Sequence, residues 1–334
     1  MKKILFLLFG TFCLSGLYSQ QTWKNLIFEG AGVRGIAYCG VLSVLEEKGV
    51  MGKIENVGGT SAGAITALMV SLGYTSNEIE KIISETKFQK FNDGAYIFIG
   101  GIYRTTHKYG WYKPDAFLSW LDKIILDKCG NSEITFAELS QMGFKNLYVT
   151  ATCLNKQKLV VFSHQNYPEM KVKDAVRISM SIPLYFEAVF VDEKGKTYEK
   201  QSKDCSLDVM VDGGILGNFP IFIFDSIYSE NGRLIRIPDY STIGIRIDTK
   251  NQIASDAETK ELVPLEIKSV SDYVNAFYII AIENLNRSTL EQFDWERTIS
   301  VSSEGIASKI RKLSEHEKKL LIESGQKFAT DFLE

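Results

Sequence analysis

The chain has 334 residues, of which 45% are hydrophobic and 24% are charged, and its formal net charge is −3. This is the composition of an ordinary globular protein, and the length allows one large domain or two smaller ones. The sequence lacks the basic excess that is typical of nucleic-acid-binding proteins, so we expect no nucleic-acid partner.

The N-terminal segment has the pattern of a secretory signal peptide. Lys2 and Lys3 precede an apolar run that extends to Tyr18 and is followed by the small residue Ser19. This pattern is typical of a cleaved export signal, and the run is short for a membrane-spanning helix. We therefore expect residues 1–19 to be a signal peptide and the protein to be periplasmic, outer-membrane-associated or secreted. The alternative is an uncleaved N-terminal segment that anchors the protein.

From residue 25 onward the chain begins with two strand–turn–helix units. Short apolar runs indicate strands, and apolar residues on one helical face followed by a glycine indicate helices. The expected elements are a strand over 25–29, a glycine-rich turn over 30–35, a helix over 36–48, a strand over 54–57, a turn over 58–63 and a helix over 64–72. This alternation is typical of α/β proteins with a mainly parallel sheet.

The remainder of the chain is less regular. Residues 88–110 are rich in aromatic side chains and contain a glycine pair, which predicts an irregular excursion, and 192–208 and 249–262 are polar enough to be surface loops. We further expect helices over 114–126, 173–180 and 314–333, and strands over 147–152, 159–162, 207–211 and 242–247.

The first motif that carries chemistry is a GxSxG sequence from Gly59 to Gly63, placed between a predicted strand and a predicted helix. In a nucleophile elbow, the glycines on either side of the serine allow the strand and the helix to approach closely. The turn holds the serine hydroxyl out toward a substrate, and the N-terminus of the helix favours nearby negative charge. Ser61 is therefore the candidate nucleophile.

The second motif is the glycine-rich loop between the first strand and the first helix. Such a loop can turn successive backbone N–H groups toward one point and form an oxyanion hole. Its candidate residues are Gly30, Ala31, Gly32, Val33, Arg34 and Gly35. The side chain of Arg34 is expected either to hold the loop or to bind an anionic group of the substrate.

The third motif is Asp212-Gly213-Gly214, which follows an apolar strand. A carboxylate at this place could accept the proton of Ser61 directly, and the two glycines would let the backbone pass close to the site. Asp-Gly is also ordinary turn chemistry. The three glycine-rich motifs together, each at the end of a strand, are much more specific than any one of them.

These motifs resemble those of the patatin-like phospholipases. The resemblance rests on the loop from Gly30, the elbow around Ser61, the Asp212-Gly-Gly sequence, the segment 177–183 and the segment 217–220. It implies a three-layer α/β/α fold and one catalytic domain over residues 20–334, with the motifs within 25–220. It also implies a Ser61–Asp212 dyad that cleaves acyl esters of lipids. The departure is Ala31, where the family often has a glycine; its N–H group can still serve if its φ is negative.

Three other functions remain open. An α/β-hydrolase with a Ser61/Asp/His triad requires a late histidine, which is His316, although that residue lies in a charged run. The loop from Gly30 fits the G-x-G-x-x-G fingerprint of dinucleotide-binding proteins, but the acidic residue expected after the next strand is absent. The third alternative is a non-catalytic lipid-binding relative.

The sequence indicates neither a metal nor a cofactor. Cys39, Cys129, Cys153 and Cys205 are widely spaced, form no CxxC pair and are expected to be buried thiols, although their pairing stays open. The expected partner is a lipid acyl ester at a membrane or micelle interface. The aromatic segment 88–111 is either a lid or lipid-contacting patch, or part of a covered satellite core. Head group, chain length, cleavage position and oligomeric state stay open.

Overall fold

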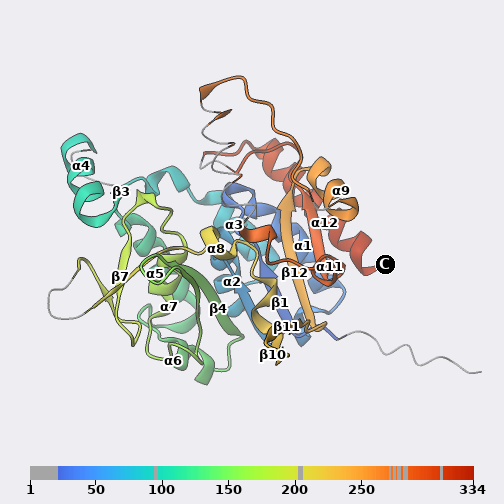
Figure 1. The fold of residues 1–334 in the computed structure, drawn as a ribbon, viewed down its shortest axis with the longest axis horizontal. Helices are drawn as coiled ribbons and strands as arrows, with labels where there is room; N and C mark the ends of the chain where they lie inside the picture. Colours follow the sequence, from blue (N-terminus) through green and yellow to red (C-terminus); the bar gives the residue numbers. More distant parts are fainter. Residues whose placement is uncertain are drawn as a thin grey trace, which may run out of the picture.

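The structure is a computed structural model that describes residues 22–93, 97–201, 206–259, 261–270, 272–273, 276, 280, 285–308 and 311–334. Residues 97–99 and 257 are described by their backbone alone. The expected signal peptide and Cys205 lie outside the described residues, as do residues 20 and 21. The chain forms a mixed α/β fold around one large sheet (Figure 1).

A nine-stranded sheet forms the centre of the fold. Its parallel half consists, in spatial order, of β13 (Thr298–Ser302), β12 (Thr242–Asp248), β1 (Asn25–Phe28), β2 (Asn56–Gly59) and β4 (Asn146–Cys153). The antiparallel half continues with β9 (Asp208–Asp212), β7 (Val189–Val191) and β8 (Thr197–Tyr198), while β5 (Lys158–Phe162) pairs with β4. The central part of the sheet is therefore mainly parallel, as expected, and the antiparallel strands lie beyond β4.

Most of the helices pack on one side of this sheet or on each other. They are α1 (Ala37–Glu47), α2 (Ala62–Ser71), α3 (Ser76–Glu85), α5 (Asp115–Cys129), α6 (Phe136–Gln141), α7 (Val172–Ser179) and α12 (Glu315–Leu333). Shorter helices are α8 (Gly214–Gly217), α9 (Lys250–Glu258) and α11 (Gln292–Glu296), with 3-10 turns η1 (Gly32–Ile36), η2 (Met51–Lys53), η3 (Phe88–Phe91) and η4 (Ile221–Phe224). Two small two-stranded sheets pair β3 (Gly110–Tyr112) with β6 (Leu184–Phe186), and β10 (Ser226–Glu230) with β11 (Arg233–Ile237).

Strand β1 shows why the fold has three layers. Its side chains alternate between the two faces of the sheet, and all four are buried. Leu26 and Phe28 belong to the main core beneath the helices, whereas Ile27 packs with Phe219 and Ile221 in a second cluster on the other face. A strand that is covered on both faces is mainly apolar, which explains the apolar run from Leu26 to Phe28.

Two expectations about irregular segments were wrong. Residues 88–110 contain the helix α4 (Ile97–Lys108), and the surface loop expected over 249–262 contains α9. The glycine pair does not break α4, because a Cβ on Gly101 would lie 2.6 Å from the indole of Trp111, so glycine permits close packing there. Helix α9 begins with an N-cap that the polar composition of the segment does not reveal. The hydroxyl of Thr249 accepts a hydrogen bond from the amide of Gln252.

Three of the cysteines lie within the described residues. Cys39 and Cys153 are buried free thiols, as expected, and Cys129 is a half-buried one. In the part of the chain that the structure describes, no helix is long and apolar enough to cross a membrane. The terminal helix α12 begins with a capping box, in which Ser314 and Glu317 exchange hydrogen bonds.

Candidate active site

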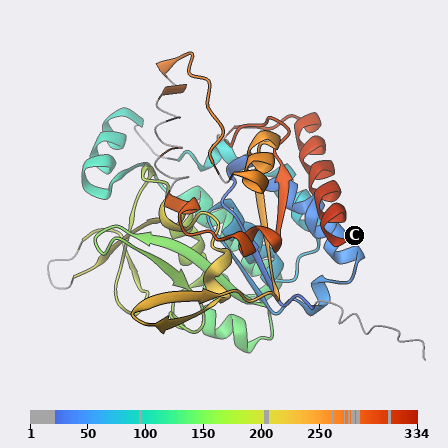
Figure 2. The same ribbon diagram turned by 45° about the vertical axis from the view of Figure 1, so that its right-hand side comes forward.

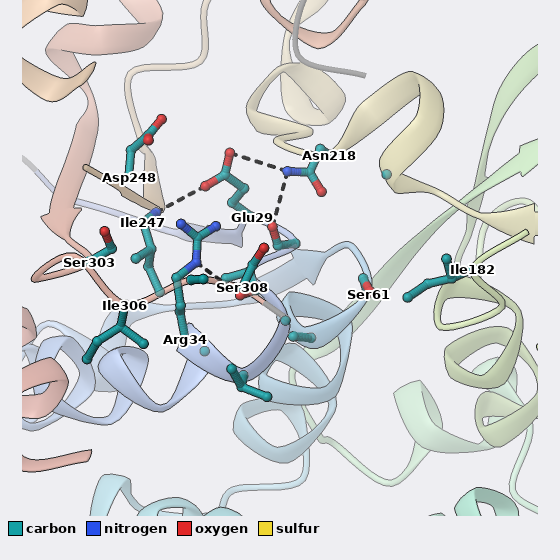
Figure 3. A pocket seen from close by; sticks show the side chains of 18 of the residues that line it. Glu29, Arg34, Ser61, Ile182, Asn218, Ile247, Asp248, Ser303, Ile306 and Ser308 are labelled. Atoms are coloured by element: carbon teal, nitrogen blue, oxygen red, sulfur yellow. Dashed lines mark hydrogen bonds between the residues drawn. The ribbon is translucent and has the colours of Figure 1, made fainter. Parts of the chain in front are cut away.

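One large cavity brings the three sequence motifs together. It has a volume of about 920 Å³, and its lining includes Ser61, Asp212, Gly214 and the whole loop from Gly30 to Gly35 (Figure 3). Ligand-binding cavities commonly have volumes of roughly 300–1,000 Å³. The motifs are separated by about 30 and 150 residues in the sequence, so only the sheet places them at one site.

Strand β4 explains how Ser61 and Asp212 meet. Its two neighbours in the sheet are β2, which runs parallel to it, and β9, which runs antiparallel. Gly59, two residues before the serine, is in register with Val149, and Asp212 is in register with Ala151. The nucleophile turn and the carboxylate therefore flank the same stretch of β4.

Ser61 has the backbone conformation of a nucleophile elbow. Its φ is 54° and its ψ is −122°, a region that non-glycine residues rarely occupy and that costs on the order of 1–3 kcal/mol. Such strain persists only where neighbouring contacts enforce it. Here the Ser61 amide donates to the Ser179 hydroxyl at 2.9 Å, and helix α2 begins at the next residue.

Glycines are required around the elbow because the backbones touch. A Cβ on Gly63 would lie 2.4 Å from the carbonyl oxygen of Phe28, and a Cβ on Gly59 would lie 2.5 Å from the carbonyl carbon of Gly63. Gly213 is similarly close to Thr150, at 2.5 Å from its hydroxyl. The elbow therefore packs directly onto the end of β1, which leads into the glycine-rich loop.

We expect Gly63→Ala to destabilise the fold by about 3 kcal/mol or more, because the new methyl group collides with immobile backbone atoms. Gly52→Ala is the matched control, because a Cβ at that glycine meets no atom within 4 Å. Urea-induced unfolding, followed by circular dichroism, measures both variants. Equal midpoints for the two alanine variants would contradict the tight contact at the elbow.

Asp212 is a buried carboxylate with an unusual pKa. Its amide donates to the carbonyl of Ser181 at 2.9 Å, and its Oδ1 accepts a hydrogen bond from the Gly214 amide at 2.7 Å. Burial raises the pKa of Asp212 to about 7, and the Gly214 amide and the Ser61 hydroxyl lower it in part. A carboxylate with a pKa near neutrality can both accept and return a proton at physiological pH.

In the resting geometry, the Ser61 hydroxyl donates to the sulfur of Met180 at 3.4 Å. A thioether is a weak acceptor, so this hydrogen bond is readily exchanged. The Asp212 carboxylate lines the same cavity as this hydroxyl.

The glycine-rich loop offers several backbone donors. Ala31 has a φ of −127°, which meets the condition of a negative φ under which its N–H group can serve in an oxyanion hole. Gly32 has the left-handed φ of +56°. Within the described residues, no group accepts a hydrogen bond from the amides of Ala31, Gly32 or Val33. The amide of Gly30, in contrast, donates to Asn218, and that of Arg34 to the carbonyl of Ala31.

Asn218 holds this loop, a role that the sequence did not reveal. Its carbonyl accepts from the Gly30 amide at 2.9 Å, and its side-chain amide donates to the Gly30 carbonyl at 3.1 Å and to Glu29 at 3.4 Å (Figure 3). The other oxygen of Glu29 accepts from the amide of Ile247. The loop is thus fixed to β12 and to the segment that follows Asp212. The Arg34 side chain donates to the carbonyl of Ala31, which fits the expectation that it holds the loop.

The remaining cavity wall is largely apolar. One group of side chains comes from the segment around η3, from β6 and from the turn before it, and the other comes from the segment after α9 and from the chain after β13. The principal members are Phe88, Phe91, Ile182, Phe186, Leu262, Val263, Leu265 and Ile306. An apolar cavity with a few convergent polar groups is suited to a ligand with a long hydrocarbon part.

None of the three histidines contributes to this cavity. His107 lies exposed on α4 and stacks on Tyr103, His164 packs near Tyr148, and His316 is exposed on α12. Among the described residues, no cluster of His, Cys, Asp and Glu could hold a metal ion.

Several known proteins are similar to this chain. The family model described as Patatin-like phospholipase matches residues 26–225. The chain is 35% identical to the uncharacterized protein YqhO of Bacillus subtilis over 59% of this chain and 65% of that one. It is 28% identical to the uncharacterized protein R571 of Acanthamoeba polyphaga mimivirus, over 92% and 93%. It is 27% identical to the probable lipid hydrolase 463L of Invertebrate iridescent virus 6, over 60% and 63%.

Solved structures give the same result for the fold. The crystal structure of VipD from Legionella pneumophila superposes with a TM-score of 0.55 at 15% sequence identity, covering 93% of this chain and 67% of that one. The similarity confirms the expected α/β class. The match to YqhO spans just under two thirds of the length of that relative.

Proposed function

This chain belongs to the patatin-like phospholipase family, and we propose that it is a lipid acyl hydrolase that cleaves carboxylic esters through an acyl-enzyme on Ser61. The observation that carries the proposal is the convergence in one apolar cavity of a strained serine, a buried carboxylate and loop amides that have no acceptor among the described residues. Each of these features has a defined role in acyl transfer.

In the first half of the reaction, Asp212 accepts the proton as the Ser61 oxygen bonds to the ester carbonyl carbon. The negative charge that forms on the carbonyl oxygen is held by N–H groups of the loop, for which Ala31, Gly32 and Val33 have amides without an internal acceptor among the described residues. The carbon–oxygen bond to the alcohol then breaks, and the leaving alkoxide takes the proton from Asp212. Rotation of the Ser61 side chain away from Met180 precedes this attack.

In the second half, Asp212 removes a proton from a water molecule that attacks the acyl carbon. The bond to the Ser61 oxygen breaks, that oxygen regains a proton from Asp212, and the fatty acid leaves. A pKa near 7 suits Asp212 for these alternating transfers. The carboxylate needs no histidine between it and the serine.

The apolar wall supports an acyl ester of a lipid as the substrate class. A cavity of about 920 Å³ has room for a long acyl chain beside the ester group. The Ser61/Asp/His316 alternative has no comparable support, because His316 is an exposed residue that does not line the cavity. No observation specifically favours a non-catalytic or dinucleotide-binding function. Export remains a separate proposal, which rests on the signal-peptide pattern of residues 1–19.

Fatty-acid release across pH tests this function. With phosphatidylcholine and p-nitrophenyl butyrate as substrates, we expect turnover to rise about tenfold per unit below pH 7 and to level off above it. The reason is that only the ionised form of Asp212, whose pKa is about 7, can accept the proton of Ser61. A flat profile between pH 5.5 and 8 would show that the base has an ordinary carboxylate pKa. An absence of turnover on both substrates would contradict the proposed hydrolase.

A further inference from the structure

Large apolar side chains are exposed around the cavity that contains Ser61. Leu184 is 68% exposed and has a φ of +66°, and it lies between the cavity-lining residues Pro183 and Phe186. A branched residue with positive φ is strained. Strain that exposes a leucine side chain to solvent indicates a functional role for that side chain.

Two further segments contribute to the same surface. Ile102 and Tyr103 on α4 are more than half exposed, and Val270 is 81% exposed at the end of residues 261–270, which we call the arm. The arm runs from α9 past the cavity, and several of its residues, such as Leu265 and Ile267, both line the cavity and remain about half exposed. The apolar interior of the cavity is therefore continuous with an apolar exterior.

The arm and α4 project from the same end of the molecule. Both views show α4 (cyan) and the arm (orange) rising beyond the end of the sheet, whereas the β10–β11 hairpin lies at the opposite end (Figures 1 and 2). The exposed apolar side chains on these segments belong to α4 (Ile102 and Tyr103), to β6 beside the cavity (Leu184), and to the arm and the residues just after it (Val270 and Tyr273). Exposed apolar side chains beside an apolar cavity indicate a site of contact with a protein or a membrane.

We propose that this surface, which we call the rim, inserts into the surface of a lipid layer and places the cavity over its substrate. The inference deepens the proposed function and rests on it, because a hydrolase of aggregated lipids must draw each acyl ester from a lipid layer into its cavity. The continuity between cavity and rim favours lipid over a protein partner, since an acyl chain can leave the layer and enter the cavity without crossing water. Binding of this kind depends on buried apolar area and resists salt.

Vesicle binding of the rim variant tests the proposal. The variant carries Ile102→Gln, Leu184→Gln and Val270→Gln, three residues that do not line the cavity, in a Ser61→Ala background that leaves the lipids intact. We expect its partition coefficient on phosphatidylcholine vesicles, measured by co-sedimentation in 0.5 M NaCl, to fall at least tenfold relative to Ser61→Ala alone. The matched control is Ile227→Gln with Leu234→Gln on the β10–β11 hairpin, where the side chains are 66% and 78% exposed. We expect that control to bind within twofold of Ser61→Ala.

The outcomes separate this inference from the proposed function. Equal loss of binding in the hairpin control, unchanged binding in the rim variant, or no vesicle binding by the parent would overturn the role of the rim. A rim-dependent dimer in analytical ultracentrifugation without vesicle binding would assign the surface to a second copy of the chain and would also overturn it. With Ser61 restored, hydrolysis of the soluble ester p-nitrophenyl butyrate should be equal in parent, rim and hairpin proteins. If the parent cleaves this ester but binds no vesicles, the hydrolase stands and the rim proposal fails.

Discussion

Ser61→Ala is expected to lower kcat for ester hydrolysis by roughly 10⁴- to 10⁶-fold, the loss seen when the nucleophile of a serine hydrolase is removed. No described neighbour can replace it, because the other polar groups at the elbow, such as the Ser179 hydroxyl, are engaged with the backbone. Alanine accepts the φ of 54° with the same strain as serine, so the fold should be retained. Steady-state hydrolysis of p-nitrophenyl butyrate measures the effect.

Two controls make this result specific. Ser71→Ala, at the other end of α2, removes a hydroxyl that donates to the carbonyl of Lys145 and should leave kcat unchanged. His316→Ala removes the histidine that a catalytic triad would require and should also leave kcat unchanged. Activity of Ser61→Ala within tenfold of the parent would rule out Ser61 as the nucleophile, and an inactive His316→Ala would favour the triad.

Asp212→Asn is expected to lower kcat by about 10²- to 10⁴-fold, the usual contribution of a general base. The asparagine keeps the size of the side chain and can still accept the hydrogen bond from the Gly214 amide, but it cannot take a proton from Ser61. Because the ionising group is gone, the residual activity should also lose the rise around pH 7. Stopped-flow and steady-state hydrolysis between pH 5.5 and 8.5 measure both effects.

The same substitution should stabilise the fold at alkaline pH. The folded-state pKa of Asp212 is about 7, above the ordinary value of 3.8, so the folded protein retains a proton that the unfolded chain has lost. Stability therefore falls as pH rises from about 4 to 7 and stays reduced above pH 7. Removing the carboxylate recovers this loss. We expect the free energy of unfolding at pH 8 to increase by up to roughly 4 kcal/mol, and by less at pH 5.

Asp208→Asn is the matched control on the same strand. The carboxylate of Asp208 pairs with Lys156 at 2.8 Å, and this ion pair, with the amide of Asn155, holds its pKa below 3.8 against the effect of burial. The effect on stability is therefore opposite to that of Asp212. The Asp208 carboxylate stabilises the fold above about pH 4, and its replacement should lower the free energy of unfolding there. Activity should not change. Stabilisation by both substitutions, or by neither, would contradict the assignment of Asp212 as the buried, unpaired base.

The sequence was most informative where local rules and tertiary packing agree. The elbow around Ser61, the loop from Gly30 and the turn after Asp212 all depend on glycines whose contacts the structure shows to be real. Strand β1 could be predicted because Leu26, Ile27 and Phe28 form an apolar run in a strand buried on both faces, whereas β2 lies two residues later than expected because Gly58 and Gly59 belong to the strand. In these segments the sequence pattern and the backbone geometry both follow from close packing of the chain.

Sequence analysis failed where distant contacts decide the structure. Helix α4 forms in spite of its glycine pair because Gly101 packs on Trp111, and no local pattern reveals that contact. The antiparallel pairing of β9 with β4 could not be anticipated, although both strands were expected, because the two strands lie far apart in the chain. The role of Asn218 was missed for a similar reason: its partners Glu29 and Gly30 lie nearly 190 residues earlier in the chain.

The most direct test of the Ser61–Asp212 mechanism is covalent labelling with a fluorophosphonate, a reagent that reacts with activated serines. We predict that one equivalent binds per chain, that peptide mass spectrometry finds it on Ser61, and that esterase activity disappears in proportion. Labelling should be greatly slowed in Asp212→Asn and unaffected in His316→Ala. Inactivation that accompanies a label on any other residue, or labelling of Ser61 at full speed without Asp212, would contradict the dyad.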